Sequence, residues 1–297
     1  MPGKETRFGE YLASEIRKYG GVYVPVKASA LLCQLKRKAR ISQVHPNPND
    51  EFCQPKVGPN YQIIGEYEHQ FREALRHSHI YCEEPVIVEK IRPDGYMLLN
   101  GHHRWGAAWR LGYKSIPVRI VNLTQETDIV KALKSSARDR RVTFDLDEVV
   151  FQKDAGAPSE RALPFPFNRL YPERLRLGIP ALFHFFAKNG YDIWVYSASY
   201  YSIGYIRALL KRYRVSVSGI VTGTGRKTRD AEAEKKHIAQ LFNSKYKTTI
   251  HISDDALLRT FSGSAAFEEY PLDASLAEWS LEIMDIVRNM DGGSQPR

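Results

Sequence analysis

Residues 95–121 read GYMLLNGHHRWGAAWRLGYKSIPVRIV, and this stretch predicts a strand, a sharp turn, a helix and a second strand. The apolar run at 96–100 is the first strand, and the run at 116–121 is the second. The letters GHHR lie between the first strand and the helix, so they place backbone N–H groups and three basic side chains at a helix N-terminus. Such a terminus attracts anions. Alternatively, the histidines cap the helix and the arginine pairs with a surface acid.

The same stretch resembles the second conserved box of the ParB/sulfiredoxin superfamily, which has the form G-x-x-R-x-x-A-A followed by a strand with I-P-V. Upstream, ALRHSHIYCEEPVIVEKI (74–91) is similar to the box that ends in P-I-V-V. The resemblance covers residues 40–122 and implies a small α+β domain that binds a nucleotide. It implies that the nucleotide phosphates contact Gly101, His102, His103 and Arg104.

The chemistry of this domain depends on which member of the superfamily it resembles. Sulfiredoxin needs a cysteine where this chain has His102, which argues against sulfinic-acid reduction. ParB itself carries G-E-R-R and uses CTP, whereas G-H-H-R is closer to the free-serine kinases, which bind an adenine nucleotide. A kinase also needs a carboxylate base, and Asp50 or Glu51 in NPNDEF could serve, although that loop also reads as an ordinary turn. ATP, ADP and CTP are the candidate nucleotides.

A second informative stretch, RRVTFDLDEVVF (140–151), ends an apolar strand in two aspartates one residue apart. If the strand continues, the carboxylates of Asp145 and Asp147 lie on one side of it, with Cα atoms about 6–7 Å apart. Two like charges that close need a positive partner. The alternative is a strand-to-turn boundary at which an aspartate caps the next element.

Downstream of residue 140, apolar strands alternate with helices, which predicts a doubly wound parallel sheet. Parallel strands bring their carboxyl ends to one edge, where ligands bind. The polar residues expected at this edge are Asp145, Asp147, Ser197, Asp254 and Asp255. Several carboxylates in one cleft favour Mg²⁺, and Lys235 or Lys236 could add a second positive charge.

These features together resemble the haloacid-dehalogenase-like (HAD) phosphohydrolase superfamily, whose four motifs match VTFDLDEVV, IWVYS, a helix-leading lysine and IHISDD. The resemblance implies a Rossmann-like domain without a full cap. It assigns Asp145 as the nucleophile, Asp147 as general acid and base, and Ser197 as a phosphoryl ligand. Lys235, favoured over Lys236, would neutralise charge. The implied Mg²⁺ ligands are Asp145, Asp147, Asp254 and Asp255.

Bulk composition fits a two-domain α/β protein of 297 residues, with 43% hydrophobic and 26% charged residues. The formal net charge of +9 favours acidic partners such as nucleotides, phosphorylated substrates or nucleic acid. Three scattered cysteines and the lack of a long apolar run indicate a cytoplasmic protein without membrane association. The sequence does not indicate an oligomeric state.

We therefore predict a ParB/sulfiredoxin-like domain at 1–137 and a HAD-like domain at 138–297. The main functional prediction is an Mg²⁺-dependent phosphatase with an aspartyl-phosphate intermediate, acting on nucleotides or nucleic-acid ends. One alternative places kinase or nuclease activity in the first domain. Another is a non-catalytic nucleic-acid-binding adaptor.

Overall fold

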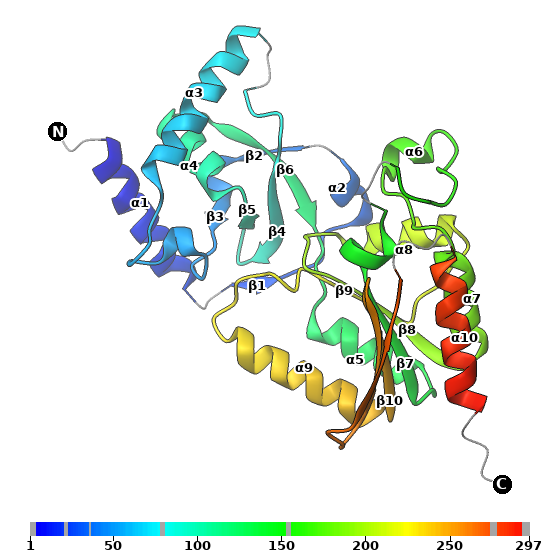
Figure 1. Cartoon of the computed structure of the whole chain (residues 1–297). Helices are drawn as coiled ribbons and strands as arrows, with labels where there is room; N and C mark the ends of the chain where they lie inside the picture. The colour runs from blue at the N-terminus through cyan, green and yellow to red at the C-terminus, as the bar shows by residue number, and fades with distance from the viewer. Residues whose placement is uncertain are drawn as a thin grey trace. The chain divides into compact units, whose positions relative to one another are not determined.

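The computed structural model describes residues 4–20, 23–35, 37–77, 81–152, 156–273 and 278–292, so residues 78–80 of the box at 74–91 lie outside the described part. The chain forms two compact units (Figure 1). Unit 1 comprises Met1–Leu123 together with Gly225–Ala231, and unit 2 comprises Thr124–Thr224 and Glu232–Arg297. The predicted domain boundary after residue 137 differs from this division, because the stretch from Thr124 onward lies in unit 2 and a short later segment lies in unit 1.

Unit 1 is built on a mixed sheet with the strand order β2-β6-β4-β5-β3, and β1 pairs with β4 at its side. The strands are β1 Val24–Pro25, β2 Arg37–Arg40, β3 Val44–Pro46, β4 Val86–Arg92, β5 Tyr96–Asn100 and β6 Ser115–Val121. β4 pairs in parallel with β6 and in antiparallel with β5, and β4 and β5 form a hairpin around the turn at Gly95. β3 runs parallel to β5, which places the loop after β3 near the end of β5.

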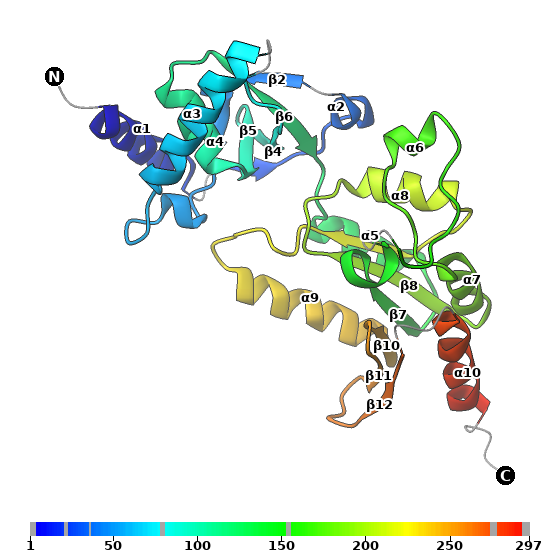
Figure 2. The same ribbon diagram turned by 45° about the horizontal axis from the view of Figure 1, so that its top comes forward.

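Helices pack against this sheet (Figure 2). The core between them is rich in aromatic side chains. The helices are α1 Lys4–Tyr19, α2 Ala30–Gln34, α3 Tyr61–His77 and α4 His102–Arg110, with short 3₁₀ turns η1 Ile41–Gln43 and η2 Glu51–Cys53. Phe8 of α1 lies against Trp105 and Trp109 of α4, with ring centroids 5.9 and 5.2 Å away. Gly106 permits this approach, since a Cβ there would lie 3.1 Å from the Phe8 ring. These contacts hold the start of α4 in a fixed position over the sheet.

Unit 2 contains a six-stranded sheet in the order β12-β11-β10-β7-β8-β9. Its strands are β7 Arg140–Asp145, β8 Tyr191–Ser197, β9 Gly219–Thr222, β10 Thr248–Ile252, β11 Ala256–Phe261 and β12 Phe267–Pro271. The four strands β10, β7, β8 and β9 pair in parallel, as the alternation of strands and helices predicts. β11 and β12 extend the sheet in antiparallel fashion. The mixed α/β architecture is therefore confirmed.

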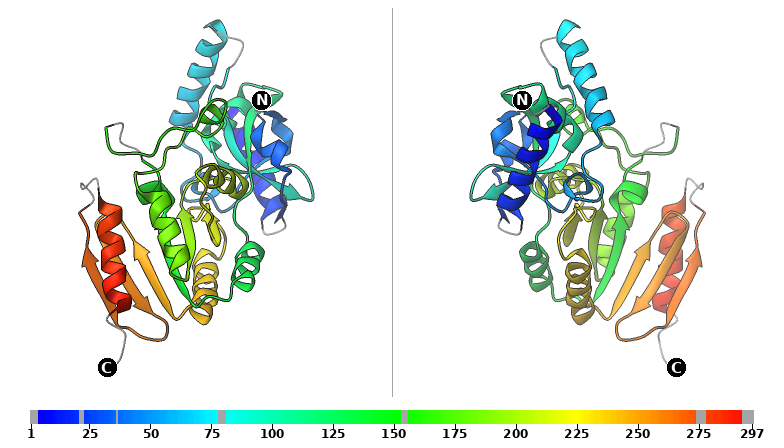
Figure 3. Two further views of the ribbon diagram at one scale, coloured as in Figure 1. Left: turned by 90° about the vertical axis from the view of Figure 1, so that its right-hand side faces the viewer. Right: turned by 90° about the vertical axis from the view of Figure 1, so that its left-hand side faces the viewer.

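Helices cover both faces of this second sheet (Figure 3). One face packs against α7 Ile179–Lys188, α8 Ile203–Arg212 and α10 Trp279–Gly292, and the other against α5 Glu126–Ser135 and α9 Ala231–Lys245. A single π-helical turn, Leu146–Val150, follows β7, and the short helix α6 Phe167–Leu170 lies in the long connection to α7. No helix of the described residues is long and apolar enough to cross a membrane.

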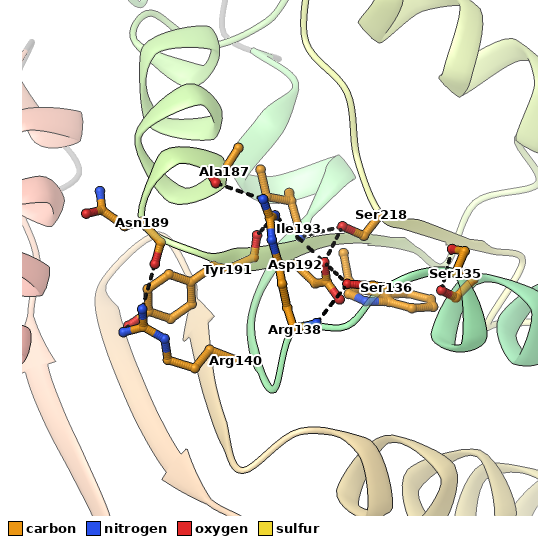
Figure 4. Close-up of polar contacts among 12 residues, drawn as sticks. Ser135, Ser136, Arg138, Arg140, Ala187, Asn189, Tyr191, Asp192, Ile193 and Ser218 are labelled. Atoms are coloured by element: carbon orange, nitrogen blue, oxygen red, sulfur yellow. Dashed lines mark hydrogen bonds and ion pairs between the residues drawn. The ribbon is translucent and has the colours of Figure 1, made fainter.

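A buried carboxylate organises the amino end of the parallel strands (Figure 4). Asp192 of β8 accepts hydrogen bonds from the hydroxyl groups of Ser136 (2.9 Å), Ser218 (3.0 Å) and Tyr246 (2.8 Å). Arg138 donates to the backbone carbonyl oxygens of Tyr191 and Ala187 nearby. These contacts satisfy the buried Asp192 carboxylate and connect β8 to the segments that carry Ser136, Ser218 and Tyr246.

Candidate functional site

The candidate site of unit 1 begins at Gly101, which joins β5 to α4. Its φ of 95° lies in the left-handed region, and a Cβ there would lie 2.8 Å from Val86 Cγ1. Only glycine fits this turn without displacing its neighbours. The first N–H groups of α4, which follow this turn directly, have no partner within the helix. This is the backbone arrangement that binds anions.

His102 is the first residue of α4, and its side chain is buried. Its Nε2 accepts a hydrogen bond from the Asn47 N–H (3.4 Å), and its Nδ1 lies 3.7 Å from Asp50 Oδ1. Burial lowers the pKa of His102 to about 4, although Asp50 acts in the opposite direction. The imidazole is therefore neutral at pH 7, with its proton on the nitrogen that faces Asp50.

His103 also favours its neutral form at pH 7, because burial lowers its pKa from the ordinary value for histidine. Its Nε2 accepts from the Asn60 N–H (3.4 Å). Phe52 lies against both imidazoles, with ring centroids 5.5 Å from His102 and 5.1 Å from His103. The two histidines thus pack and accept hydrogen bonds, and they supply little of the positive charge that the sequence suggested.

Arg104 is buried and engaged in contacts within unit 1. Its Nη1 pairs with Glu84 Oε2 (2.8 Å) and donates to the Glu84 carbonyl oxygen (3.0 Å), and its Nη2 donates to Asn100 Oδ1 (3.2 Å). The alternative in which the arginine pairs with a surface acid therefore matches the structure. Arg104 ties the end of β5 to the start of β4, and its charge is largely balanced before any ligand arrives.

The loop after β3 carries two neighbouring carboxylates, of which Asp50 lies near His102 at the start of α4. Asp50 Oδ1 accepts from the Phe52 N–H (3.0 Å) and so caps η2. Asn47 is buried, and its Oδ1 accepts from the Asn49 N–H (3.1 Å), which shapes the loop. The Glu51 side chain is 66% exposed, with Oε1 3.6 Å from Lys227 Nζ. NPNDEF is therefore a structured turn that also carries both candidate bases.

Sequence reasoning missed several residues around this loop. Lys227 and Arg226 come from the segment Gly225–Ala231, and Arg226 pairs with Glu89 of β4. The basic run GRKTR (225–229) was visible in the sequence, but nothing in it indicates a contact with residues 47–89. Asn47 gave no signal beyond turn chemistry.

In unit 2, the structure brings three predicted site residues together. β7 ends at Asp145, whose Oδ1 accepts from the N–H groups of Asp147 (2.6 Å) and Glu148 (2.9 Å). Ser197, at the end of β8, donates to Asp147 Oδ2 (2.6 Å), and Ser199 donates to Asp147 Oδ1 (3.2 Å). The strand does not continue through the second aspartate, so the capping alternative describes Asp145. The catalytic roles of Asp145, Asp147 and Ser197 stay predictions.

The remaining predicted residues of unit 2 have other partners. Asp254 Oδ1 pairs with Arg176 Nη1 (3.0 Å), and Asp255 accepts from Ser253 (2.9 Å). The Lys235 side chain is 65% exposed and pairs with Glu232 on the same helix (3.1 Å). Within the ranges that the structure describes, no three His, Cys, Asp or Glu side chains lie close enough to hold a metal ion. The proposed Mg²⁺ ligand set stays a prediction.

Comparison with known proteins finds a family match in the region that contains the candidate site of unit 1. Residues 53–137 match the ParB N-terminal domain, which confirms the resemblance carried by the G-H-H-R stretch. An ATP-dependent L-serine kinase from Staphylothermus marinus is 33% identical over 72 residues, which are 24% of this chain and 28% of that protein. The chain thus spans about a quarter of the length of this curated relative.

Two solved structures are also similar in part. One is the C-terminally truncated chromosome-partitioning protein ParB from Caulobacter crescentus complexed with CTP-gamma-S (TM-score 0.24, 22% identity), matched over 35% of this chain and 56% of that one. The other is a free serine kinase variant in complex with AMP (TM-score 0.23, 12% identity), matched over 89% and 85%. Both scores are below 0.5, so neither structure establishes a shared overall fold.

These findings correct the main functional prediction. The predicted hydrolase activity, a HAD-type phosphatase, was wrong, because the curated relative is a phosphotransferase that uses ATP. No comparison supports the HAD-like assignment of residues 138–297 or its Rossmann-like HAD fold. The parallel strands and the contacts of Asp145, Asp147 and Ser197 stand as observations without an assigned activity.

Proposed function

We propose that this protein is an ATP-dependent kinase whose catalytic site lies in unit 1 and whose acceptor is the hydroxyl group of a small molecule. The observation that carries the proposal is the glycine turn at the start of α4, with the Asp50 carboxylate near His102 and Glu51 next to it on the same loop. The serine kinase relative supports ATP as the donor and makes L-serine the first acceptor to test. No observation favours the nuclease alternative.

The start of α4 fits the phosphates of a nucleotide. Gly101 makes a left-handed turn that a Cβ would obstruct, because it would lie 2.8 Å from Val86 Cγ1, and the first N–H groups of α4 have no partner within the helix. His102 and His103 are neutral and pack closely against their neighbours. This suits a site in which backbone N–H groups bind the phosphates. Mg²⁺ would arrive with the nucleotide phosphates, as it commonly does in kinases, and would neutralise part of their charge.

The two carboxylates have different surroundings, and this separates their proposed roles. Asp50 caps η2 and faces His102, so it positions the imidazole and the loop. Glu51 is more exposed and makes no cap, and it is held only by a loose pair with Lys227 (3.6 Å), so its carboxylate can meet a substrate hydroxyl. In the reaction, the substrate oxygen forms a bond to the γ-phosphorus while the bond from that phosphorus to the β–γ bridging oxygen breaks. Glu51 accepts the hydroxyl proton, and ADP leaves.

The test is ADP release from ATP in the presence of L-serine and Mg²⁺, measured for wild type, Glu51→Gln and Asp50→Asn. We expect Glu51→Gln to lower kcat about 100-fold or more with little change in the KM for ATP, because it removes only the base. The matched control is Glu66→Gln, an exposed glutamate of α3, which should leave kcat unchanged.

Different failures lead to different corrections. If wild type releases ADP neither with L-serine nor with any compound of a panel of small hydroxyl compounds, the kinase proposal is wrong. If Asp50→Asn abolishes turnover while Glu51→Gln retains it, the kinase stands and the base is reassigned to Asp50.

A further inference from the structure

The segment Gly225–Ala231 belongs to unit 1 although it lies more than 100 residues beyond the rest of that unit. It connects β9 to α9 and reads GRKTRDA. Two of its residues, Arg226 and Lys227, contact elements next to the candidate site. Arg226 anchors the segment to β4, and Lys227 carries a positive charge next to Glu51.

The anchor is an ion pair with a buried carboxylate. Arg226 Nη1 lies 3.1 Å from Glu89 Oε2, and the Glu89 side chain is 2% exposed on β4. Burial raises the pKa of Glu89, while Arg226 and the backbone N–H of Leu123 favour its ionised form. A buried carboxylate of this kind needs a partner, so the pair fixes where the segment lies.

A second contact fixes the next residue along the chain. Asn47 Nδ2 donates to the Lys227 carbonyl oxygen (3.0 Å), and the backbone N–H of the same asparagine donates to His102 Nε2. One buried asparagine thus links the backbone of Lys227 to the first residue of α4. The ion pair of Arg226 with Glu89 and the hydrogen bond from Asn47 to the Lys227 carbonyl oxygen therefore fix the position of Lys227 relative to the glycine turn.

The Lys227 side chain carries a positive charge that His102 and His103 do not supply. His102 and His103 are neutral at pH 7, and Arg104 is paired with Glu84. Lys227 Nζ lies 3.6 Å from Glu51 Oε1 and is 54% exposed, so its ammonium group is held loosely and near the proposed base. Transfer of a phosphoryl group requires a cation at the charge that develops on its oxygens.

Resting on the proposed kinase function, we propose that Lys227 is the lysine that binds the terminal phosphate of the nucleotide, and that the pairs Arg226–Glu89 and Asn47–Lys227 position it for this. In the absence of nucleotide, Glu51 is its partner. When the triphosphate binds, the ammonium group moves to the phosphate, and Glu51 is released to accept the proton of the acceptor.

The test compares affinities for ATP and AMP by calorimetry on the full chain, because AMP lacks the terminal phosphate. We expect Lys227→Gln to weaken ATP binding about tenfold or more and to leave AMP binding within twofold of wild type. Lys227→Arg, which keeps the charge, should retain most of the ATP affinity. The matched control is Lys247→Gln, which also removes an exposed lysine paired with a carboxylate, that of Asp139, and should change neither affinity.

Each outcome decides the matter. Equal ATP affinity in wild type and Lys227→Gln, with wild-type kinase activity present, overturns the role of Lys227 and leaves the kinase proposal intact. An equal loss for ATP and AMP also overturns it, since the terminal phosphate would then not be what Lys227 recognises. If wild type binds neither nucleotide, the proposed function itself is wrong and this inference fails with it.

Discussion

At the scale of single residues, His102 controls how unit 1 responds to acid. Its pKa is about 4 in the folded protein because the ring is buried, against about 6.5 in the unfolded chain. Between these values the unfolded chain binds more protons. The stability contributed by the neutral ring is therefore fully present above pH 6.5 and is lost as the pH falls toward 4.

We expect this residue to account for about 3 kcal/mol of the fall in the free energy of unfolding between pH 7 and pH 4. Urea unfolding of wild type and His102→Gln across this range measures it, and the variant should show a shallower fall. His184→Gln, at an exposed histidine of α7, is the control and should follow wild type. Parallel curves for wild type and His102→Gln would contradict the assigned pKa.

The same residues show what a sequence can and cannot predict at this scale. The letters GHHR correctly indicated a turn into a helix, and Gly101 has the backbone conformation that such a turn needs. The charge assigned to the histidines was not correct, because a pKa depends on burial and on neighbours such as Asp50 from a different loop. For Asp145, the spacing alone left two readings open, and only the end of β7 decided between them.

At the scale of elements, the attachment of the segment 225–231 to β4 has a measurable energy. Arg226→Gln leaves the Glu89 carboxylate buried without its cation, which should lower the free energy of unfolding by about 3 kcal/mol. Glu89→Gln removes the charge itself and should cost less. In the double variant the two costs should not add, because each single substitution already breaks the same pair.

Chemical unfolding of the four proteins of this double-mutant cycle gives the coupling free energy. A matched control is Arg288→Gln, which removes an exposed arginine paired with Asp285 on its own helix, and we expect a change of less than about 0.5 kcal/mol. Additive costs for Arg226→Gln and Glu89→Gln would show that the two side chains do not act as a pair.

Elements with strong local patterns were predictable, and those without were not. β4, β5, β6 and the four parallel strands of unit 2 are short apolar runs, and the helices between them carry an apolar face. β12 gives no such signal: Phe267 is mostly exposed, and the strand pairs on one side only, with β11. β12 forms because β11 offers an edge to pair with, so the residues of β12 alone do not predict this strand.

At the scale of the whole molecule, the sequence could not predict which segments of the chain make up unit 1. The sequence predicts a single boundary after residue 137, whereas the compact units divide after residue 123 and the later segment 225–231 belongs to unit 1. Contacts between residues more than 130 positions apart, such as Glu89 with Arg226, leave no periodic trace in either stretch. A fragment of residues 1–137 lacks the segment 225–231, so this fragment provides a test of the proposed domains 1–137 and 138–297.

Glu89→Gln should have opposite effects in the full chain and in a fragment of residues 1–137. In the full chain it breaks the pair with Arg226 and lowers the free energy of unfolding by about 2 kcal/mol. In the fragment, Arg226 is missing, so the wild-type carboxylate is buried without a cation, and removing its charge should raise the melting temperature by about 4 °C.

Thermal unfolding at pH 7 of both lengths, each with and without the substitution, tests this reversal, with circular dichroism to establish that the fragment is folded. The control is Glu66→Gln, which should shift neither protein. A substitution that destabilises both lengths alike would mean that Glu89 is stabilised from within residues 1–137, and the segment 225–231 would then not complete unit 1. A reversal of sign would show that unit 1 needs a segment from the second half of the chain.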